Sequence, residues 1–302
     1  MNKRILKSIL ILWMFGCTLL LSAATYYVDS RNGNDTYNGS GISGAWKSLA
    51  KVNSQSFNPG DTICFLRSCE WTGELTINSS GTELRPIIFT AYGKGTKPII
   101  KNPDVNRATS IKIIADWVIV ENFLVMESHA AGIAINTGSE HNIIRNNEAT
   151  KVGIGISING THNLVTKNYA HDLIMVVNNE GGDNDYGAVG IWLYSSDNEV
   201  SYNKLINCKA PSYDYGFDGG VVEFYGDVDS CYVHHNWGEN CIGAFEVGGG
   251  QAVTLTHNTV SFNIFINNGG AGGFHMGGKF GVKYEDWVVD NNVFLKTILL
   301  IK

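Results

Sequence analysis

A six-residue phrase recurs seven times between residues 117 and 291, and it constrains the fold more than any other feature of this 302-residue chain. Each copy has an apolar third residue and ends in asparagine: WVIVEN (117–122), NIIRNN (142–147), NLVTKN (163–168), NEVSYN (198–203), CYVHHN (231–236), VTLTHN (253–258) and DWVVDN (286–291). The final residues are Asn122, Asn147, Asn168, Asn203, Asn236, Asn258 and Asn291, and their numbers differ by 25, 21, 35, 33, 22 and 33. Such a period is the mark of stacked structural units. A spacing just above 20 residues fits one turn of a β-solenoid, and the longer spacings fit turns that carry an insertion.

The composition of these segments indicates strands rather than helices. They are rich in Val, Ile, Gly and Asn, and they lack the 3.6-residue apolar stripe of an amphipathic helix. Asparagines that recur at one bend can hydrogen-bond from turn to turn, which satisfies polar groups that would otherwise be buried without partners. We therefore predict a solenoid of β-strands in which all seven asparagines stack in the interior.

Short stretches between the repeats alternate as strands that face a core do. These are Ile133 and Ile135, Ile156 and Ile158, Ile191 and Leu193, Val222 and Phe224, Phe245 and Val247, and Phe274 and Met276. Upstream of the repeats, Trp46, Leu49, Ala50 and Val52 are spaced as the apolar face of one short helix. Because repeat stacks need a terminal cap, we expect this helix to cover the open N-terminal end.

Four segments before the repeats resemble secreted bacterial proteins of the pectin lyase-like superfamily: YYVDSRNGNDTYNGS (26–40), AWKSLAKVN (45–53), PGDTICF (59–65) and RPIIFTAYGKGTKPII (85–100). The asparagine-ended phrases are similar to that superfamily's parallel β-helix repeat. The resemblance implies an all-β fold, a right-handed parallel β-helix. It does not imply one reaction, because the superfamily includes lyases, hydrolases, epimerases and non-catalytic adhesins or tailspikes. The paired Asp and His-Gly motifs of its polygalacturonases are not found here, which disfavours that activity.

The N-terminus predicts export. Basic residues precede an apolar stretch over 9–21, and small residues follow it at 22–24, which together predict a signal peptide over 1–24. We expect a single β-helix domain over 25–302, with a cap region at about 25–85, repeats at about 86–297 and a truncated C-terminal end. The mature protein is expected to be secreted, periplasmic or on the cell surface, monomeric and without a membrane span.

Charge and cysteine content narrow the range of partners. A net charge of −6 without a basic patch argues against nucleic acid. Five cysteines follow the predicted signal peptide: Cys64, Cys69, Cys208, Cys231 and Cys241. This odd count has no zinc-type spacing, so we predict buried thiols, with one disulfide as the alternative.

Aligning the strands that follow the Gly-rich bends predicts one column of outward-facing side chains. The column holds Ala134, Ser157, Trp192, Glu223, Glu246 and His275. Neighbouring turns are about 4.8 Å apart, so we expect the two carboxyl groups and the imidazole to stack on one surface. The three longest insertions, 178–186, 209–219 and 277–285, are expected to wall a groove over this column.

These residue types suit the chemistry of carbohydrates. Two carboxyl groups about 5–5.5 Å apart are the machinery of a retaining glycosidase, and close carboxylates push each other's pKa values apart. We predict Glu223, Glu246, His275 and Asp218 as catalytic residues, and Trp192, Tyr194, Tyr215, Tyr225 and Asp214 as substrate-binding residues. In the Gly-rich segment 181–185, Asp183 and Asp185 predict a Ca²⁺ site, with a solvated turn as the alternative.

Three functions remain open. A glycoside hydrolase would use the glutamate pair and need no cofactor. A polysaccharide lyase would use His275 or Lys279 as base, with Ca²⁺ on the acidic cluster to stabilise the anion. A non-catalytic β-helix would only hold a polysaccharide or oligosaccharide on the same column.

Overall fold

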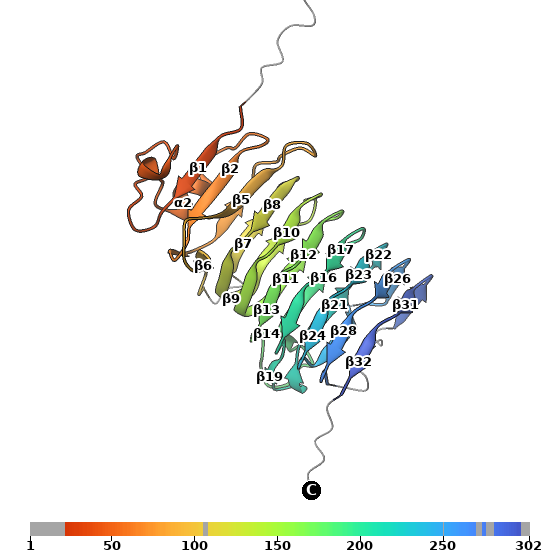
Figure 1. Ribbon diagram of the computed structural model, residues 1–302. Helices are drawn as coiled ribbons and strands as arrows, with labels where there is room; N and C mark the ends of the chain where they lie inside the picture. The colour runs from red at the N-terminus through yellow and green to blue at the C-terminus, as the bar shows by residue number, and fades with distance from the viewer. Residues whose placement is uncertain (1–21, 105–107, 250, 270–273, 276–280, 297–302) are drawn as a thin grey trace, which may run out of the picture.

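The computed structural model describes residues 22–104, 108–249, 251–269, 274–275 and 281–296. Short parallel strands stack turn upon turn along one axis, from the N-terminal end to the C-terminal end (Figure 1). The complete turns contribute strands to three faces. The predicted right-handed parallel β-helix is confirmed.

The first face is a sheet of ten parallel strands. In spatial order these are β1 (Thr25–Val28), β2 (Thr62–Leu66), β5 (Ile87–Tyr92), β8 (Val118–Glu121), β10 (Ile143–Arg145), β12 (Leu164–Thr166), β17 (Glu199–Ser201), β23 (Tyr232–His234), β27 (Thr259–Ser261) and β31 (Val288–Asp290).

The second and third faces are joined, because two long strands, β9 (Leu124–Ile135) and β11 (Glu148–Ile158), run through both. The second face adds β3 (Glu70–Thr72), β6 (Ile99–Lys101), β13 (Tyr169–His171), β18 (Lys204–Ile206), β24 (Trp237–Glu239), β28 (Ile264–Ile266) and β32 (Val293–Leu295). The third face adds β4 (Leu75–Ile77), β7 (Thr109–Ile113), β16 (Val189–Leu193), β21 (Gly220–Tyr225), β25 (Gly243–Gly248) and β29 (Phe274–His275).

Smaller elements decorate the bends. Two antiparallel hairpins arise within the insertions: β14 (Met175–Val177) pairs with β15 (Tyr186–Gly187), and β19 (Ala210–Ser212) pairs with β20 (Gly216–Asp218). A three-stranded parallel sheet, β22 (Val228–Asp229), β26 (Val253–Thr256) and β30 (Val282–Glu285), forms beyond the third face.

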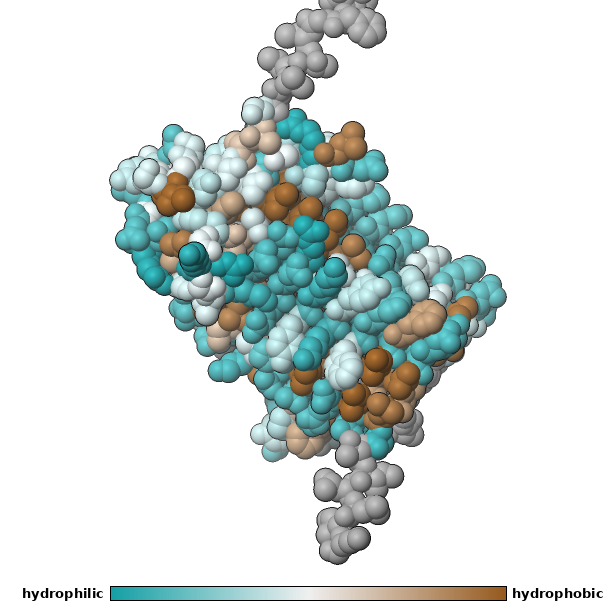
Figure 2. Space-filling model, viewed as in Figure 1, coloured by the Kyte–Doolittle hydropathy of each residue, from teal (hydrophilic) through white to brown (hydrophobic). Residues whose placement is uncertain are grey.

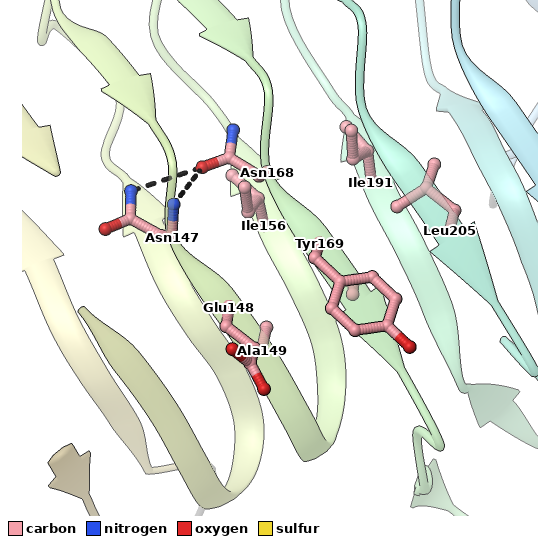
Figure 3. Close-up of a pocket in the computed structure, with 9 residues that line it drawn as sticks. Asn147, Glu148, Ala149, Ile156, Asn168, Tyr169, Ile191 and Leu205 are labelled. Atoms are coloured by element: carbon pink, nitrogen blue, oxygen red, sulfur yellow. Dashed lines mark hydrogen bonds between the residues drawn. The ribbon is translucent and has the colours of Figure 1, made fainter. Parts of the chain in front are cut away.

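Two ladders of asparagines run along two of the bends. The longer ladder contains Asn147, Asn168, Asn203, Asn236, Asn263 and Asn292, and each side-chain oxygen accepts a hydrogen bond of 2.9–3.1 Å from the backbone N–H one turn earlier. The other contains Asn142, Asn163, Asn198 and Asn258, with Cys231 between the last two. Figure 3 shows the step from Asn147 to Asn168, beside a small cavity lined by Ile156, Ile191 and Leu205.

The prediction that all seven asparagines stack at one bend is wrong for three of them. Asn122 and Asn291 each lie one residue before the ladder position, at φ 68° and 51°, and Phe123 and Asn292 occupy the ladder itself. Asn258 belongs to the other ladder. Asparagine is favoured both in the left-handed conformation of the bend and in the interior behind it, so the sequence alone does not separate these positions.

The helix interior is apolar, as the alternation predicts. The ten predicted core residues from Ile133 to Val247 are all buried, whereas Met276 and the side chain of Phe274 lie outside the described residues. The predicted cap is present at the N-terminal end (Figure 1): helix α2 (Leu49–Asn53) buries Leu49 and Val52, and a short 3-10 turn over Ile42–Gly44 precedes it. The predicted apolar face is wrong for two residues, because Trp46 lies before the helix and Ala50 is exposed. Trp46 stacks on Tyr26 of β1, with ring centroids 5.0 Å apart.

The outer surface is mainly polar in the view of Figure 2, with several apolar patches, one of them towards the C-terminal end. There the exposed apolar residues of the last described turn are Val288, Val289, Val293, Phe294 and Leu295. Cys64, Cys69, Cys208, Cys231 and Cys241 are buried free thiols, as predicted. Within the described part of the chain, no helix has the length and hydropathy required to span a membrane.

Candidate active site on the third face

The backbone register places the predicted column on the third face, one residue per turn. Partners across neighbouring strands are Ala134 with Ser157, Ser157 with Trp192, Trp192 with Glu223, Glu223 with Glu246, and Glu246 with His275. Upstream, the same column continues to Lys112 and Thr76. Val222 and Phe224 on either side of Glu223 are fully buried, so the alternation of the strand turns Glu223 outward.

Among the described carboxyl groups, Glu223 has the environment that departs furthest from that of an ordinary surface carboxyl. Burial raises its pKa well above the usual value for glutamate, and the negative charges of Glu246 and Asp218 raise it further. The carboxyl leans over Gly248, two residues beyond Glu246 on β25: a Cβ atom on Gly248 would lie 2.7 Å from Glu223 Oε1. Glu223 is therefore held protonated to a higher pH than a solvated glutamate.

An aromatic cluster flanks the carboxyl pair on its N-terminal side. Trp192 meets Tyr225 edge-on at 5.1 Å between ring centroids and contacts Tyr186 at 5.8 Å and Tyr194 at 6.0 Å. Tyr194 and Tyr225 stack at 5.2 Å. Burial raises the pKa of Tyr225, as does the nearby Glu223. Rings and carboxyl groups thus form one continuous surface.

One polar atom in this cluster, Trp192 Nε1, is buried and has no hydrogen-bond partner among the residues that the structure describes. A buried donor without a hydrogen bond lowers stability by about 1–3 kcal/mol. Such groups are rare in native structures, and a functional role is one explanation for them. This N–H lies in the turn directly before Glu223.

The two insertion hairpins reach the column and are pinned to each other. Ser212 Oγ of the β19–β20 hairpin donates to Asp185 Oδ2 at 2.7 Å, and the Asp214 backbone N–H donates to the same oxygen at 3.1 Å. In return, Asp214 Oδ2 accepts from the backbone N–H of Asn184 at 2.8 Å. Tyr215 donates its hydroxyl to Asp183 at 2.8 Å. These carboxylates stabilise the loops that carry Tyr186 and Asp218 to the column.

These hydrogen bonds between the hairpins change the interpretation of four residues, two that were predicted to bind Ca²⁺ and two that were predicted to bind substrate. Asp185 is buried, and its pKa is lowered by hydrogen bonds from backbone N–H groups and Ser212 that outweigh its desolvation. Asp183, Asp214 and Tyr215 are engaged between the hairpins as described above. Among the described residues, these carboxylates do not form a group of three converging metal ligands. Backbone N–H groups and hydroxyl groups already donate to oxygens of Asp183, Asp185 and Asp214, so the geometry favours a structural role over calcium or substrate binding.

His275 joins the column by its backbone, which pairs with Glu246, while its side chain lies outside the described residues, as do Lys279 and the first part of the insertion 277–285. Asp218 lies close enough to raise the pKa of Glu223. Sequence reasoning missed Tyr186 and Gly248. The signal for Gly248 was the run of glycines that follows Glu246 at an offset of two, the spacing of one strand face.

Fold and site together define a parallel β-helix that presents a paired-carboxyl and aromatic surface on one face. No protein-family model matches the chain, and no curated protein matches it.

Solved structures with the same fold do match. The chain is similar to the pectate lyase Pel9A, with a TM-score of 0.60 and 15% identity over 92% of this chain and 80% of that one. It is similar to XylC in complex with xylose, with a TM-score of 0.59 and 10% identity over 88% and 68%. The PL6 family alginate lyase AlyGC gives a TM-score of 0.53 and 14% identity over 89% and 38%. At these identities the likeness shows the fold alone.

Proposed function

We propose that this protein is a carbohydrate-active enzyme that cleaves a glycosidic bond on the third face, with Glu223 as the general acid and Glu246 as the partner carboxylate. The observation that carries the proposal is the raised pKa of Glu223 beside a second carboxyl one strand away. Strands lie about 4.8 Å apart, close to the separation of about 5–5.5 Å in retaining glycosidases. The proposed mechanism is therefore retaining.

Each partner has a defined part in this mechanism. Glu223, kept neutral by burial and by Glu246, would donate its proton to the leaving-group oxygen. Glu246 would attack the anomeric carbon and form a glycosyl–enzyme intermediate, which water then hydrolyses with Glu223 acting as base. Asp218 would hold the pKa of Glu223 high through the cycle, because its negative charge remains beside it.

The aromatic cluster supports a sugar as the substrate. The exposed ring of Tyr194, stacked on Tyr225, offers an apolar surface with polar edges of the kind that binds the faces of pyranose rings. Gly248 leaves room beside Tyr225 and Glu223 that any side chain would fill.

Charge disfavours eliminative cleavage without a metal. A lyase needs positive charge near the uronate carboxyl. The nearest basic residue of the described column is Lys112, four strands before Glu223 and therefore about 19 Å away. The Ca²⁺-assisted lyase and the non-catalytic glycan-binding β-helix remain as outcomes of the experiment.

The test is incubation of the purified protein with neutral and uronate polysaccharides, with and without Ca²⁺, while reducing ends and the absorbance of unsaturated uronate ends are followed together. New reducing ends without that absorbance are expected. Rising absorbance that needs Ca²⁺ would replace the hydrolase with a lyase. Binding without any new ends would reduce the site to a glycan-binding surface.

A further inference from the structure

A second cluster of chemistry-bearing side chains lies away from the carboxyl column, at the bend that leads from the third face back to the first. Glu140, His141 and His162 each offer one ligand atom there, and these atoms all lie within 4.8 Å of one another. His141 and His162 occupy the same position in consecutive turns, two residues before the paired strands β10 and β12. Among the described residues this is the one such convergence of three ligands.

The arrangement is fixed by the same bend geometry that builds the solenoid. His141 and His162 both adopt left-handed backbone conformations, at φ 58° and 56°, which project successive side chains along one line outside the bend. Trp117 of the preceding turn stacks on His141, with ring centroids 4.1 Å apart and planes inclined by 10°. Thr161 donates its hydroxyl to Glu140 Oε1 at 3.1 Å. One imidazole and the carboxylate are thus oriented before any ligand arrives.

We propose that Glu140, His141 and His162 form a binding site for a divalent transition metal ion, with Zn²⁺ as the natural occupant. Two imidazoles and one carboxylate are a donor set that Zn²⁺ takes in proteins with an open fourth position, whereas Ca²⁺ prefers oxygen ligands alone. Ligands at about 2.0–2.1 Å from a tetrahedral zinc lie about 3.3 Å from one another. Glu140 and His162 are exposed, so small rotations of these side chains close the remaining gap, and an ion can enter from solvent.

The site would clamp two consecutive turns of the solenoid, because its ligands come from both. Glu140 and His141 belong to one turn, and His162 belongs to the next. Metal bound only by the folded protein stabilises it in proportion to the logarithm of its concentration over the dissociation constant. The proposal is independent of the reaction assigned to Glu223.

A control for the proposed site lies at the equivalent bend three turns after His162. His257 also adopts a left-handed conformation there, at φ 49°. Among the described side chains no second histidine lies beside it: its Nδ1 lies 2.9 Å from Asp229 Oδ1 and its Nε2 lies 3.6 Å from Asp286 Oδ2. A His257→Ala variant therefore removes a surface imidazole from a carboxylate setting without touching the proposed site.

The experiment is calorimetric titration of the tag-free protein with ZnCl₂, paired with thermal unfolding at rising Zn²⁺ concentration. We expect one Zn²⁺ per chain in the wild type and in His257→Ala. His141→Ala and His162→Ala should each weaken binding at least about 10-fold and abolish the zinc-dependent rise in unfolding temperature. Glu140→Gln should weaken binding to a lesser degree, because both imidazoles remain.

Several results would overturn the proposal. One is the absence of saturable binding to the wild type. Another is binding that persists at full strength in the double variant His141→Ala/His162→Ala, which would assign the metal to other ligands such as the cysteine thiols. Loss of binding in His257→Ala alone would move the site to the other bend.

Discussion

Two columns of side chains run along this molecule, and they differ in whether the residue type is repeated from turn to turn. The asparagine ladder from Asn147 to Asn292 repeats one residue in every turn, and every step makes the same hydrogen bond. The outward column of the third face changes residue at nearly every step, from Lys112 through Trp192 to the Glu223–Glu246 pair. Each step of the ladder is a hydrogen bond between neighbouring turns, whereas the column holds two neighbouring carboxyls and an N–H without a partner among the described residues.

The contrast separates structure from function within one fold. A residue that recurs in every turn serves the stacking itself, since each turn needs the same bend. A residue that occurs once, in a position where like charges oppose each other, lowers stability unless something else requires it. Changes in the column should therefore alter chemistry with little effect on folding, and changes in the ladder should do the reverse.

Glu223→Gln is expected to have the largest effect. It keeps the shape of the side chain but removes the proton donor, and general acid catalysis is worth about 10²–10⁴-fold, so polysaccharide cleavage should fall by that factor. The loss in kcat/KM should be much smaller on a synthetic glycoside whose leaving group needs no protonation, because kcat/KM does not include the second step, in which Glu223 acts as base. Both rates would be measured beside those of Glu83→Gln, an exposed glutamate outside the column. Equal losses on the two substrates would contradict the role of acid.

Asn203→Ala tests whether the asparagine ladder stabilises the fold. Asn203 Oδ1 accepts from the Asn168 backbone N–H at 2.9 Å, and Asn203 Nδ2 donates to the Val165 carbonyl at 2.9 Å. Each buried group left unsatisfied costs roughly 1–3 kcal/mol, so the free energy of unfolding should fall by about 2–6 kcal/mol. Chemical denaturation measures this, with the exposed Asn179→Ala as the control. A change below that of the control would show that the ladder is dispensable.

The same contrast explains what could be predicted from sequence. The fold and the register of Glu223 and Glu246 follow from periodicity, because repetition is visible in one dimension. The roles of Asp183 and Asp185 could not be predicted, because their oxygens are occupied by hydrogen bonds within their own hairpin and from the second hairpin, about 30 residues away in the chain. The space at Gly248 was equally hidden, since it depends on how far the Glu223 side chain leans across a neighbouring strand.

Gly248→Ala tests the outward column in a different way, because it should displace the Glu223 carboxyl without removing it. The new Cβ would lie 2.7 Å from Glu223 Oε1 and 3.0 Å from the Tyr225 ring, so the flexible carboxyl must move aside. Activity should fall about 10-fold or more, since a displacement of about 1 Å can cost about 10²-fold, while the unfolding midpoint changes little. Gly220→Ala is the matched control on the strand of Glu223, because its new Cβ meets no atom closer than 3.5 Å. Equal activity in the two variants would exclude a role for this space.

The smallest expected effect is the change in stability caused by Glu223→Gln. Its sign distinguishes the outward column, where the substitution should stabilise the protein at neutral pH, from the asparagine ladder, where substitution should destabilise it. The folded state raises the pKa of Glu223, so the stability contributed by its neutral form is fully present below the unfolded pKa of about 4.3. That contribution is lost as the pH rises through the higher pKa of the folded state, because the unfolded chain then binds fewer protons than the folded one. Glu223→Gln carries no such charge. It should match the wild type in acid and exceed it at neutral pH by up to about 1 kcal/mol, or roughly 2–4 °C in unfolding temperature. Thermal unfolding of both proteins from acidic to neutral pH measures the difference, and Glu83→Gln should show none. A Glu223→Gln variant less stable than the wild type at neutral pH would mean that Glu223 stabilises the fold, as the asparagines of the ladder do. The outward column and the ladder would then both serve stability.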